Sequence, residues 1–160
     1  MRTVHWLFAV GAALFVFGIG FVITGARQRE APEAAPPALT PVASIAQVMN
    51  GIVSPGAYVV FDSVGSISTR AGIQEIAPKN DEEWQRVGAG AAAVIEGGNL
   101  LLMDGRAVDR GDWVTMTKAM MTAGAGALKA AEAKNTDAIL EAGSVLNTAC
   151  DTCHQRYQRQ

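Results

Sequence analysis

The chain has 160 residues, of which 49% are hydrophobic, and a formal net charge of −2. No cluster of Lys and Arg is long enough to follow a phosphate backbone, which argues against nucleic acid as a partner. About 120 residues follow the first forty, which is enough for one compact domain. The hydrophobic β-branched and aromatic residues form no alternating runs, so no strands are expected. Frequent Gly and Ala favour close-packed helices instead.

The N-terminal stretch over residues 4–24 contains no Lys, Arg, Asp or Glu. Its length is sufficient to cross a bilayer as a helix, and Trp6 suits the membrane interface. We therefore predict a transmembrane anchor over residues 1–26. Thr24-Gly25-Ala26 also suits a cleavage site, so a signal peptide that is removed is the alternative.

Residues 27–41 are predicted to form a linker, because four of the six prolines lie between Glu30 and Pro41. Such a segment is extended and semi-rigid, and would separate the anchor from a domain over residues 42–160. A disordered tail without a spacer role is the other interpretation. Charge does not settle the orientation of the anchor, since arginines lie on both sides of it.

Four helical segments are predicted after the linker, from apolar residues that recur about every 3.6 positions. The first covers residues 42–64. A kink is expected at Pro55, because proline lacks an N–H and crowds the carbonyl of Gly51. Residues 65–80 are rich in Gly, Ser, Pro and Asn, and are predicted to be a connecting loop.

The second segment begins near Asp81, where consecutive acidic residues suit the positive end of the helix dipole, and it ends at Gly105. The third covers residues 110–134, and Asn135 or Thr136 is the predicted N-cap of the fourth. Helices of this length with mostly short connections predict an all-α fold. The expected architecture is an antiparallel four-helix bundle with an N-terminal transmembrane helix.

The run Cys150-Asp151-Thr152-Cys153-His154 lies in the fourth segment. Two thiols followed by an imidazole at this spacing are typical of covalent c-type haem attachment. Positions i, i+3 and i+4 of a helix share a face. Cys150 and Cys153 can therefore each form a thioether with a haem vinyl group, while His154 reaches the iron. Because the thiols continue the apolar stripe of this helix, the cofactor is expected in the interior.

Three other interpretations of the motif are weaker. A thiol oxidoreductase usually carries Cys-x-x-Cys near a βαβ pattern and where a helix begins, not where one ends. A structural zinc site needs four ligands, and the only other histidine is His5, inside the apolar N-terminal stretch. A disulfide between Cys150 and Cys153 would leave His154 without a role.

Residues 41–160 resemble the class II cytochromes c, the group that contains cytochrome c′ and its low-spin relatives. The resemblance rests on four helices with the haem motif in the last, on the residues 150–157 near the C-terminus, and on Gly98-Asn-Leu-Leu-Leu102 at the end of the second helix. It implies one haem c per chain, with the cysteines of the motif as thioether sites and its histidine as the proximal ligand. The anchor and the linker depart from the soluble members.

The resemblance also implies that the first helix forms the distal side of the haem. Met49 lies on the apolar face of that helix, so it is the predicted distal residue and a candidate sixth ligand of the iron. Plain core packing is the alternative role for this methionine. Four further methionines are less well placed by the pattern, namely Met103, Met116, Met120 and Met121.

Charged residues near the motif are the other candidates for contact with the cofactor. Family members often carry Arg or Lys four residues after the haem histidine, where this chain has Gln158. Arg156 and Arg159 flank that place, and both also suit a solvated helix end. Arg106, together with Arg110, lies between the second and third helices and is a candidate contact for the haem propionates.

Electron transfer through haem c is the expected function, with redox proteins in or at the membrane as partners. In exported cytochromes c the haem is attached outside the bacterial cytoplasm. The domain is therefore expected at the periplasmic face of the inner membrane, or free in the periplasm if the leader is cleaved. A five-coordinate protein that binds NO or CO is the alternative. The resemblance is compatible with a homodimer, and no arrangement of acid and base residues indicates an enzyme.

Overall fold

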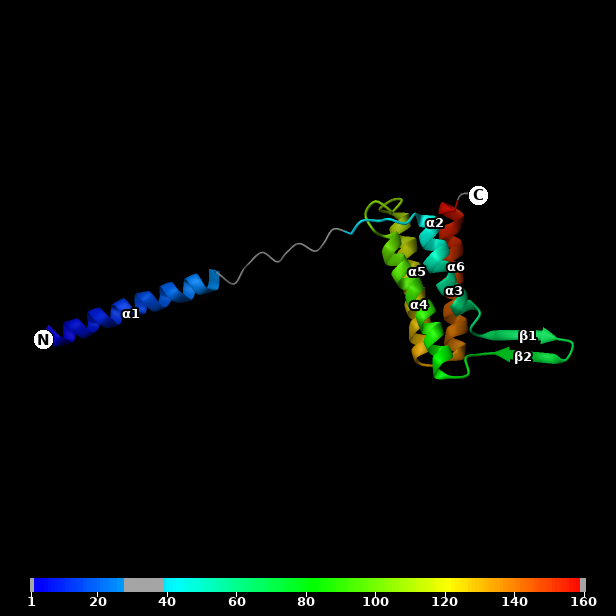
Figure 1. Cartoon of the computed structure of the whole chain (residues 1–160), viewed down its shortest axis with the longest axis horizontal. Coiled ribbons are helices and arrows are strands. Elements are labelled where there is room, and N and C mark those ends of the chain that lie inside the picture. The colour runs from blue at the N-terminus through cyan, green and yellow to red at the C-terminus, as the bar shows by residue number, and fades with distance from the viewer. Residues whose placement is uncertain (1, 28–38, 159–160) are drawn as a thin grey trace. The chain divides into compact units, whose positions relative to one another are not determined.

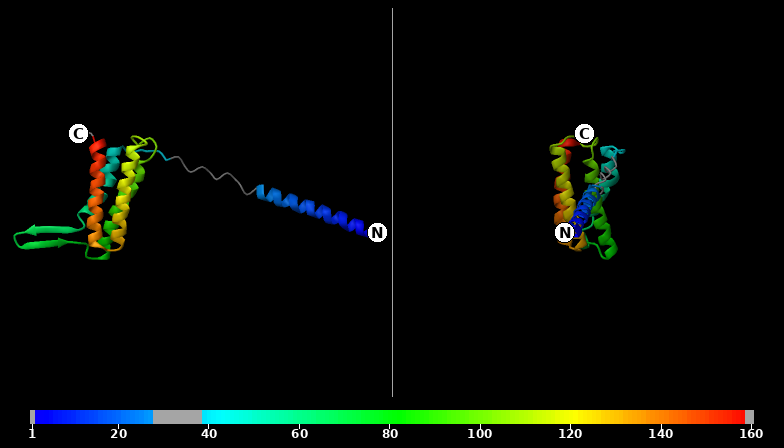
Figure 2. Two further views of the ribbon diagram at one scale, coloured as in Figure 1. Left: turned by 180° about the vertical axis from the view of Figure 1, so that it is seen from behind. Right: turned by 90° about the vertical axis from the view of Figure 1, so that its left-hand side faces the viewer.

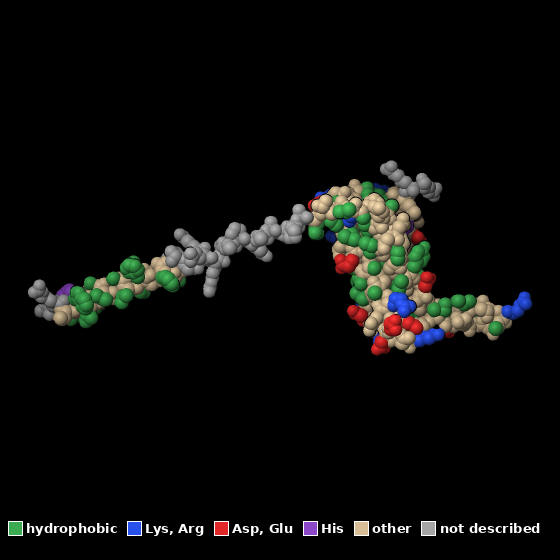
Figure 3. All heavy atoms as spheres, viewed as in Figure 1, with side chains coloured by type: hydrophobic (Ala, Val, Ile, Leu, Met, Phe, Trp, Pro, Cys, Tyr) green, Lys and Arg blue, Asp and Glu red, His purple; other side chains and the backbone are tan. Residues whose placement is uncertain are grey.

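The computed structural model describes residues 2–27 and 39–158. The chain divides into two compact units, and the second begins at Leu39. Helix α1 (Arg2–Arg27) belongs to the first unit (Figure 1). Apolar side chains gather along the face of α1 seen in Figure 3. Its Thr3–Val22 part, with a mean hydropathy of 2.0, is long and apolar enough to cross a membrane or to serve as a signal sequence. Most of the linker predicted over 27–41 lies outside the described residues.

The second unit is mainly helical, as the sequence predicts. Consecutive long helices run in opposite directions, and α3 packs on α4, α4 on α5, and α5 on α6 (Figures 1 and 2). The segments α2, η1 and α3 follow one another without a break and act as one helix, called the first domain helix below. The helical bounds are α2 Ile45–Val48, η1 Met49–Val53, α3 Ser54–Phe61, α4 Asp81–Leu101, α5 Asp112–Glu132 and α6 Thr136–Tyr157.

The first domain helix is shorter than predicted and is wound differently in its middle. It begins after a capping box, in which the Ser44 Oγ accepts from the Gln47 N–H (3.2 Å) and the Gln47 side chain accepts from the Ser44 N–H (2.9 Å). The segment Met49–Val53 is a π-helical turn. Pro55 follows in the first turn of α3, where a missing N–H is tolerated. The chain thus accommodates the proline through a change of winding and continues as a helix.

The expectation of no strands is wrong, and residues 65–80 are not wholly a loop. Strand β1 (Gly65–Thr69) pairs antiparallel with β2 (Gly72–Ile76), and the hairpin projects from the helices (Figure 1). Its isoleucines are separated by Gly, Ser, Thr and Gln, which hides the pattern in the sequence. The register pairs Ile67 with Gln74, Ser68 with Ile73 and Gly65 with Ile76. Ile67 and Ile76 therefore lie on one face and Ile73 on the other, and neither face is apolar throughout.

The other helices begin and end within a few residues of their predicted limits. Helix α4 begins at Asp81 as predicted, because the Asn80 side chain accepts a hydrogen bond from the Glu83 N–H (2.9 Å). It ends at Leu101, and the chain then turns through non-helical residues to α5. Asn135 caps α6 by accepting from the N–H of Ala138 (3.0 Å), which confirms one of the two predicted N-caps.

Among residues 39–158, buried apolar side chains form three clusters along the helices. The cluster nearest the C-terminus of α6 is the largest, and Cys150 and Tyr157 pack against it. The cysteine motif is therefore attached to the core through its own helix. The buried members of this cluster are Val48, Val53, Ala57, Val94, Leu101, Trp113, Met120, Ala123 and Leu146. The other two clusters centre on Trp84 with Ile139, and on Val60 with Ala127.

Two glycines, Gly56 and Gly90, face each other where α3 packs on α4. A Cβ atom added at Gly90 would lie 2.8 Å from the carbonyl oxygen of Gly56 and 2.8 Å from the Cβ of Val59. Neither atom is the end of a flexible side chain, so the helices would have to separate. By contrast, a Cβ at Gly126 on α5 would meet nothing within 4 Å. The close approach predicted from the glycine content thus occurs at particular positions.

We expect Gly90→Ala to lower the free energy of unfolding by about 1–3 kcal/mol, because overpacking outweighs the better helix propensity of alanine. Gly126→Ala is the matched control and is expected to raise the free energy of unfolding by up to about 1 kcal/mol. Urea unfolding followed by circular dichroism measures both. Equal effects of the two substitutions would contradict the packing described for α3 and α4.

Candidate functional site

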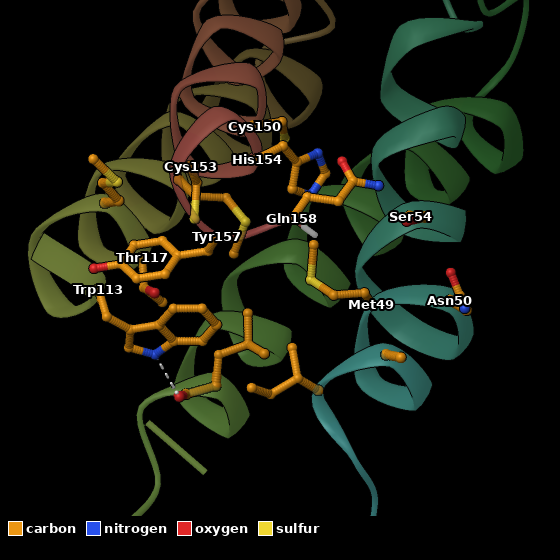
Figure 4. A pocket seen from close by; sticks show the side chains of 15 residues that line it. Met49, Asn50, Ser54, Trp113, Thr117, Cys150, Cys153, His154, Tyr157 and Gln158 are labelled. Carbon is orange, nitrogen blue, oxygen red and sulfur yellow. Dashed lines mark hydrogen bonds between the residues drawn. The ribbon is translucent and has the colours of Figure 1, made fainter. Parts of the chain in front are cut away.

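A cavity of about 510 Å³ lies between the first domain helix, α5 and the end of α6. Cys150, Cys153 and His154 line it from α6, and Met49 lines it from the first domain helix (Figure 4). The structure therefore brings four of the five predicted site residues to one cavity. Further lining residues are Ile45, Ala46, Asn50, Ser54, Leu101, Trp113, Met116, Thr117, Met120, Tyr157 and Gln158.

The α6 side of the cavity is set by helical spacing. Cys150, Cys153 and His154 are all partly buried, and the cysteines are free thiols in this structure. Because the three residues occupy positions i, i+3 and i+4, they lie on one face of α6. The helix ends at Tyr157, and the Gln158 N–H donates to the carbonyl of His154 (2.9 Å). The motif thus occupies the final turns of a helix whose earlier turns are packed in the core.

Burial raises the pKa of both thiols above the ordinary value for cysteine. For Cys150, the negative charges of Asp151 and of a Cys153 thiolate raise the pKa further. The thiols are therefore stable as neutral groups at neutral pH. Thiols of dithiol oxidoreductases instead have lowered pKa values, because the thiolate is the reactive form. The electrostatics of this pair are the reverse of what that chemistry requires.

Met49 lies where the first domain helix changes to π-helical winding. Its side chain extends into the cavity on the side where His154 and Gln158 lie (Figure 4). Local π turns are often found at functional sites, because they change the direction in which a side chain leaves the helix. Met116 and Met120 line the same cavity from α5, so both are closer to the motif than the sequence pattern indicated.

Arg106 does not line this cavity. It is largely buried, and its guanidinium donates to the carbonyl oxygens of Ala43 (3.1 Å) and Leu100. These bonds fasten the chain before the first domain helix to the end of α4. A propionate contact of Arg106 therefore stays a prediction, and the guanidinium already has other acceptors. Arg110, its predicted neighbour in that role, pairs with Asp104 at the surface (2.6 Å).

The sequence reasoning missed a polar contact beside the motif. The Tyr157 hydroxyl donates to Asp109 Oδ2 (2.5 Å), and the Tyr157 ring packs edge-on against Trp113, with ring centroids 5.1 Å apart. The hydrogen bond from Tyr157, followed by that from the Gly111 N–H, lowers the pKa of Asp109. The same carboxylate raises the pKa of Tyr157. An aspartate two residues before a glycine is a turn signal in the sequence. The hydrogen-bond partner of Asp109, Tyr157, is 48 residues away, so local signals do not identify it.

The polar residues at the end of α6 divide between the cavity and the surface. Gln158 lines the cavity, together with Asn50 and Ser54 from the first domain helix. Arg156 instead forms an exposed ion pair with Asp112 (2.9 Å). Arg159 lies outside the described residues. The residue four places after the histidine is thus uncharged and in contact with the cavity.

No protein-family model, curated protein or solved structure matches this chain. Across residues 2–27 and 39–158, no three side chains of His, Cys, Asp and Glu come together as ligands of a bare metal ion. The cavity residues instead combine two thiols and one imidazole with a mainly apolar wall. The thiols and the imidazole are the groups of the cavity that could hold a cofactor.

In the chain without attached cofactor, we expect the two thiols to react slowly with iodoacetamide. The pH midpoint of the reaction rate is expected above 9, because burial raises the pKa of both thiols from that ordinary value. The thiolate is the nucleophile, so the rate follows its population. Mass spectrometry of the alkylated protein at several pH values measures this midpoint. In denaturant the midpoint is expected to fall to the ordinary value. A midpoint below that value in the folded chain would indicate activated thiols and favour thiol redox chemistry.

Proposed function

We propose that the chain is a c-type cytochrome that transfers electrons through one covalently attached haem. The observation that carries the proposal is the position of Cys150, Cys153 and His154 on one face of α6, lining a cavity that Met49 lines from another helix. The spacing of the thiols and the imidazole is that of c-type haem attachment. The resemblance to the class II cytochromes c, drawn from the sequence, supports the same function.

The size and lining of the cavity support a haem. A volume of about 510 Å³ lies within the range of sites for cofactor-sized molecules, and is far larger than a site for one ion needs. Leu101, Trp113 and Met120 are buried apolar residues in its wall. They would pack on the faces of a porphyrin and exclude water from it.

The bound haem would supply one-electron chemistry between ferric and ferrous iron. The residues of the chain would hold it and adjust its potential. Cys150 and Cys153 would fix it to α6 as thioethers, and His154 would offer its imidazole from the same helix. Met49 would offer a neutral thioether from the first domain helix. A neutral sulfur ligand and an apolar wall both disfavour the more highly charged ferric state, and so raise the potential.

The proposed setting is the periplasmic face of a bacterial inner membrane. We propose that α1 is an anchor and that the second unit is an antiparallel four-helix bundle of the first domain helix, α4, α5 and α6. An anchor would raise the local concentration of the domain near redox proteins of the same membrane. Cleavage of the leader would give a soluble periplasmic form. In both cases the expected partners are redox proteins at the membrane, and a homodimer is compatible with the proposal.

A second candidate function is the binding of NO or CO at a five-coordinate iron. Ile45 and Ala46 lie in the same cavity wall as Met49, so an apolar distal side would remain if Met49 packed without binding iron. The two functions require the same haem and the same proximal histidine. They differ in the role of Met49, which a single substitution tests.

We expect the chain matured in a cell with a haem-attachment system to gain the mass of one haem on the peptide that contains residues 150–154. The double variant Cys150→Ala/Cys153→Ala is expected to lose the added mass completely, since both thioether sites are removed. Thr152→Ala, a change of an exposed residue within the same motif, is the control and should retain it. Unmodified thiols in the matured wild-type chain would overturn the proposal.

We expect Met49→Ala to convert a six-coordinate low-spin spectrum into a five-coordinate high-spin one, to remove the methionine–iron charge-transfer band, and to lower the midpoint potential. Met116→Ala removes a methionine from the same cavity on α5, and is expected to leave the ligation unchanged. Absorption spectra of both reduced and oxidised proteins, with and without CO, provide the measurement. A wild-type spectrum that is already high-spin and responds to CO would favour the gas-binding function.

A further inference from the structure

Tyr157 attaches the last turn of α6 to the rest of the domain through its side chain. Tyr157 is the final residue of the helix, three positions after His154 and four after Cys153, so all three lie on the same face. Its hydroxyl donates to Asp109 in the connection between α4 and α5, and its ring contacts Trp113 on α5. Helix ends fray readily, because their last carbonyls have no partners within the helix. A fixed contact at this position therefore limits fraying of the turn that carries the His154 imidazole.

Asp109 is itself held in place by backbone donors. Its Oδ1 accepts from the N–H of Gly111 (2.8 Å) and from the N–H of Trp113 (3.2 Å), while Oδ2 accepts from Tyr157. The Trp113 indole donates to the carbonyl of Leu101 (3.0 Å), at the end of α4. A continuous series of hydrogen bonds and a ring contact thus joins the ends of α4 and α6 through the beginning of α5.

The neighbouring contact is of a different kind. Arg156 pairs with Asp112, but both side chains are more than half exposed. Ion pairs of this type contribute little, because water and salt screen them. The Tyr157 bond is partly buried and charge-assisted, which makes it the stronger of the two contacts. Tyr157 and Trp113 also line the cavity, so the same contact sets the position of part of its wall.

We propose that Tyr157, held by Asp109, is a positioning residue that fixes the last turn of α6 and with it the direction of the His154 imidazole toward the cavity. This inference rests on the proposed function and extends it to a residue outside the Cys-x-x-Cys-His motif. Tyr157 does not bind iron in this proposal. It limits the movement of the residue that does, and thereby holds the ligand field and the potential constant.

The test compares Tyr157→Phe with Tyr58→Phe in the full chain. Each substitution removes one hydroxyl and keeps a ring that contacts another aromatic side chain; Tyr58 lies against Phe61, with centroids 6.3 Å apart, on the exposed side of α3. Tyr58 does not line the cavity. The two variants therefore differ in whether the lost hydroxyl is bonded to Asp109 beside the motif.

We expect Tyr157→Phe to speed amide hydrogen exchange several-fold in the segment 150–157, and to shift the midpoint potential and broaden the spectrum of the haem-loaded protein. Tyr58→Phe should change none of these. Asp109→Ala should reproduce the exchange effect, and the double variant should add little to it, because both residues act through one bond.

The proposal is overturned if Tyr157→Phe lowers only the unfolding temperature and leaves exchange in residues 150–157, the spectrum and the potential at their wild-type values. A chain that carries no haem would refute the proposed function separately. In that case the exchange measurement still decides whether Tyr157 holds the last turn, since it needs no cofactor. Unchanged exchange would then reject the positioning role.

Discussion

The attachment of the last two turns of α6 to the rest of the domain is the constraint on which the site depends. Cys150 packs against the main core cluster. Tyr157, seven residues after Cys150, donates a hydrogen bond to Asp109. The motif lies between these two points of attachment. The earlier turns of α6 are packed in the core through Ile139 and Leu146, and these two contacts continue that attachment to the end of the helix.

The position of the cavity follows from where the first domain helix finds its closest neighbour. That helix packs mainly on α4, where the facing glycines Gly56 and Gly90 allow their backbones to approach. Its contacts with α6 are fewer. Side chains therefore fill the space on the α4 side, and room remains between this helix and α6. The π-helical turn that begins at Met49 lies along this space, so a change of winding and a gap in the packing coincide.

Local signals in the sequence were sufficient for the starts of α4 and α6, but not for contacts between distant residues. Asn135 acts on N–H groups a few positions away, so its role as a cap can be inferred from the residues around it. Arg106 was predicted to contact a cofactor because it is a cation between two helices. In the fold its guanidinium is largely buried and bonds to the carbonyl of Ala43, 63 residues away. The hairpin was missed because Ile73 and Ile76 of β2 are three residues apart and so fall on opposite faces, which removes the usual alternation.

The partial burial of the motif bears on the proposed chemistry in several ways. Removal of water raises the pKa of Cys150 and Cys153, which disfavours thiolates and therefore reversible dithiol exchange. A thioether carries no charge, so the same environment imposes no such electrostatic cost on sulfur once it is alkylated. An apolar wall also favours the less charged state of a bound iron porphyrin. The partial burial of Cys150 and Cys153 thus argues against a redox thiol pair and supports the proposal of a permanently attached cofactor.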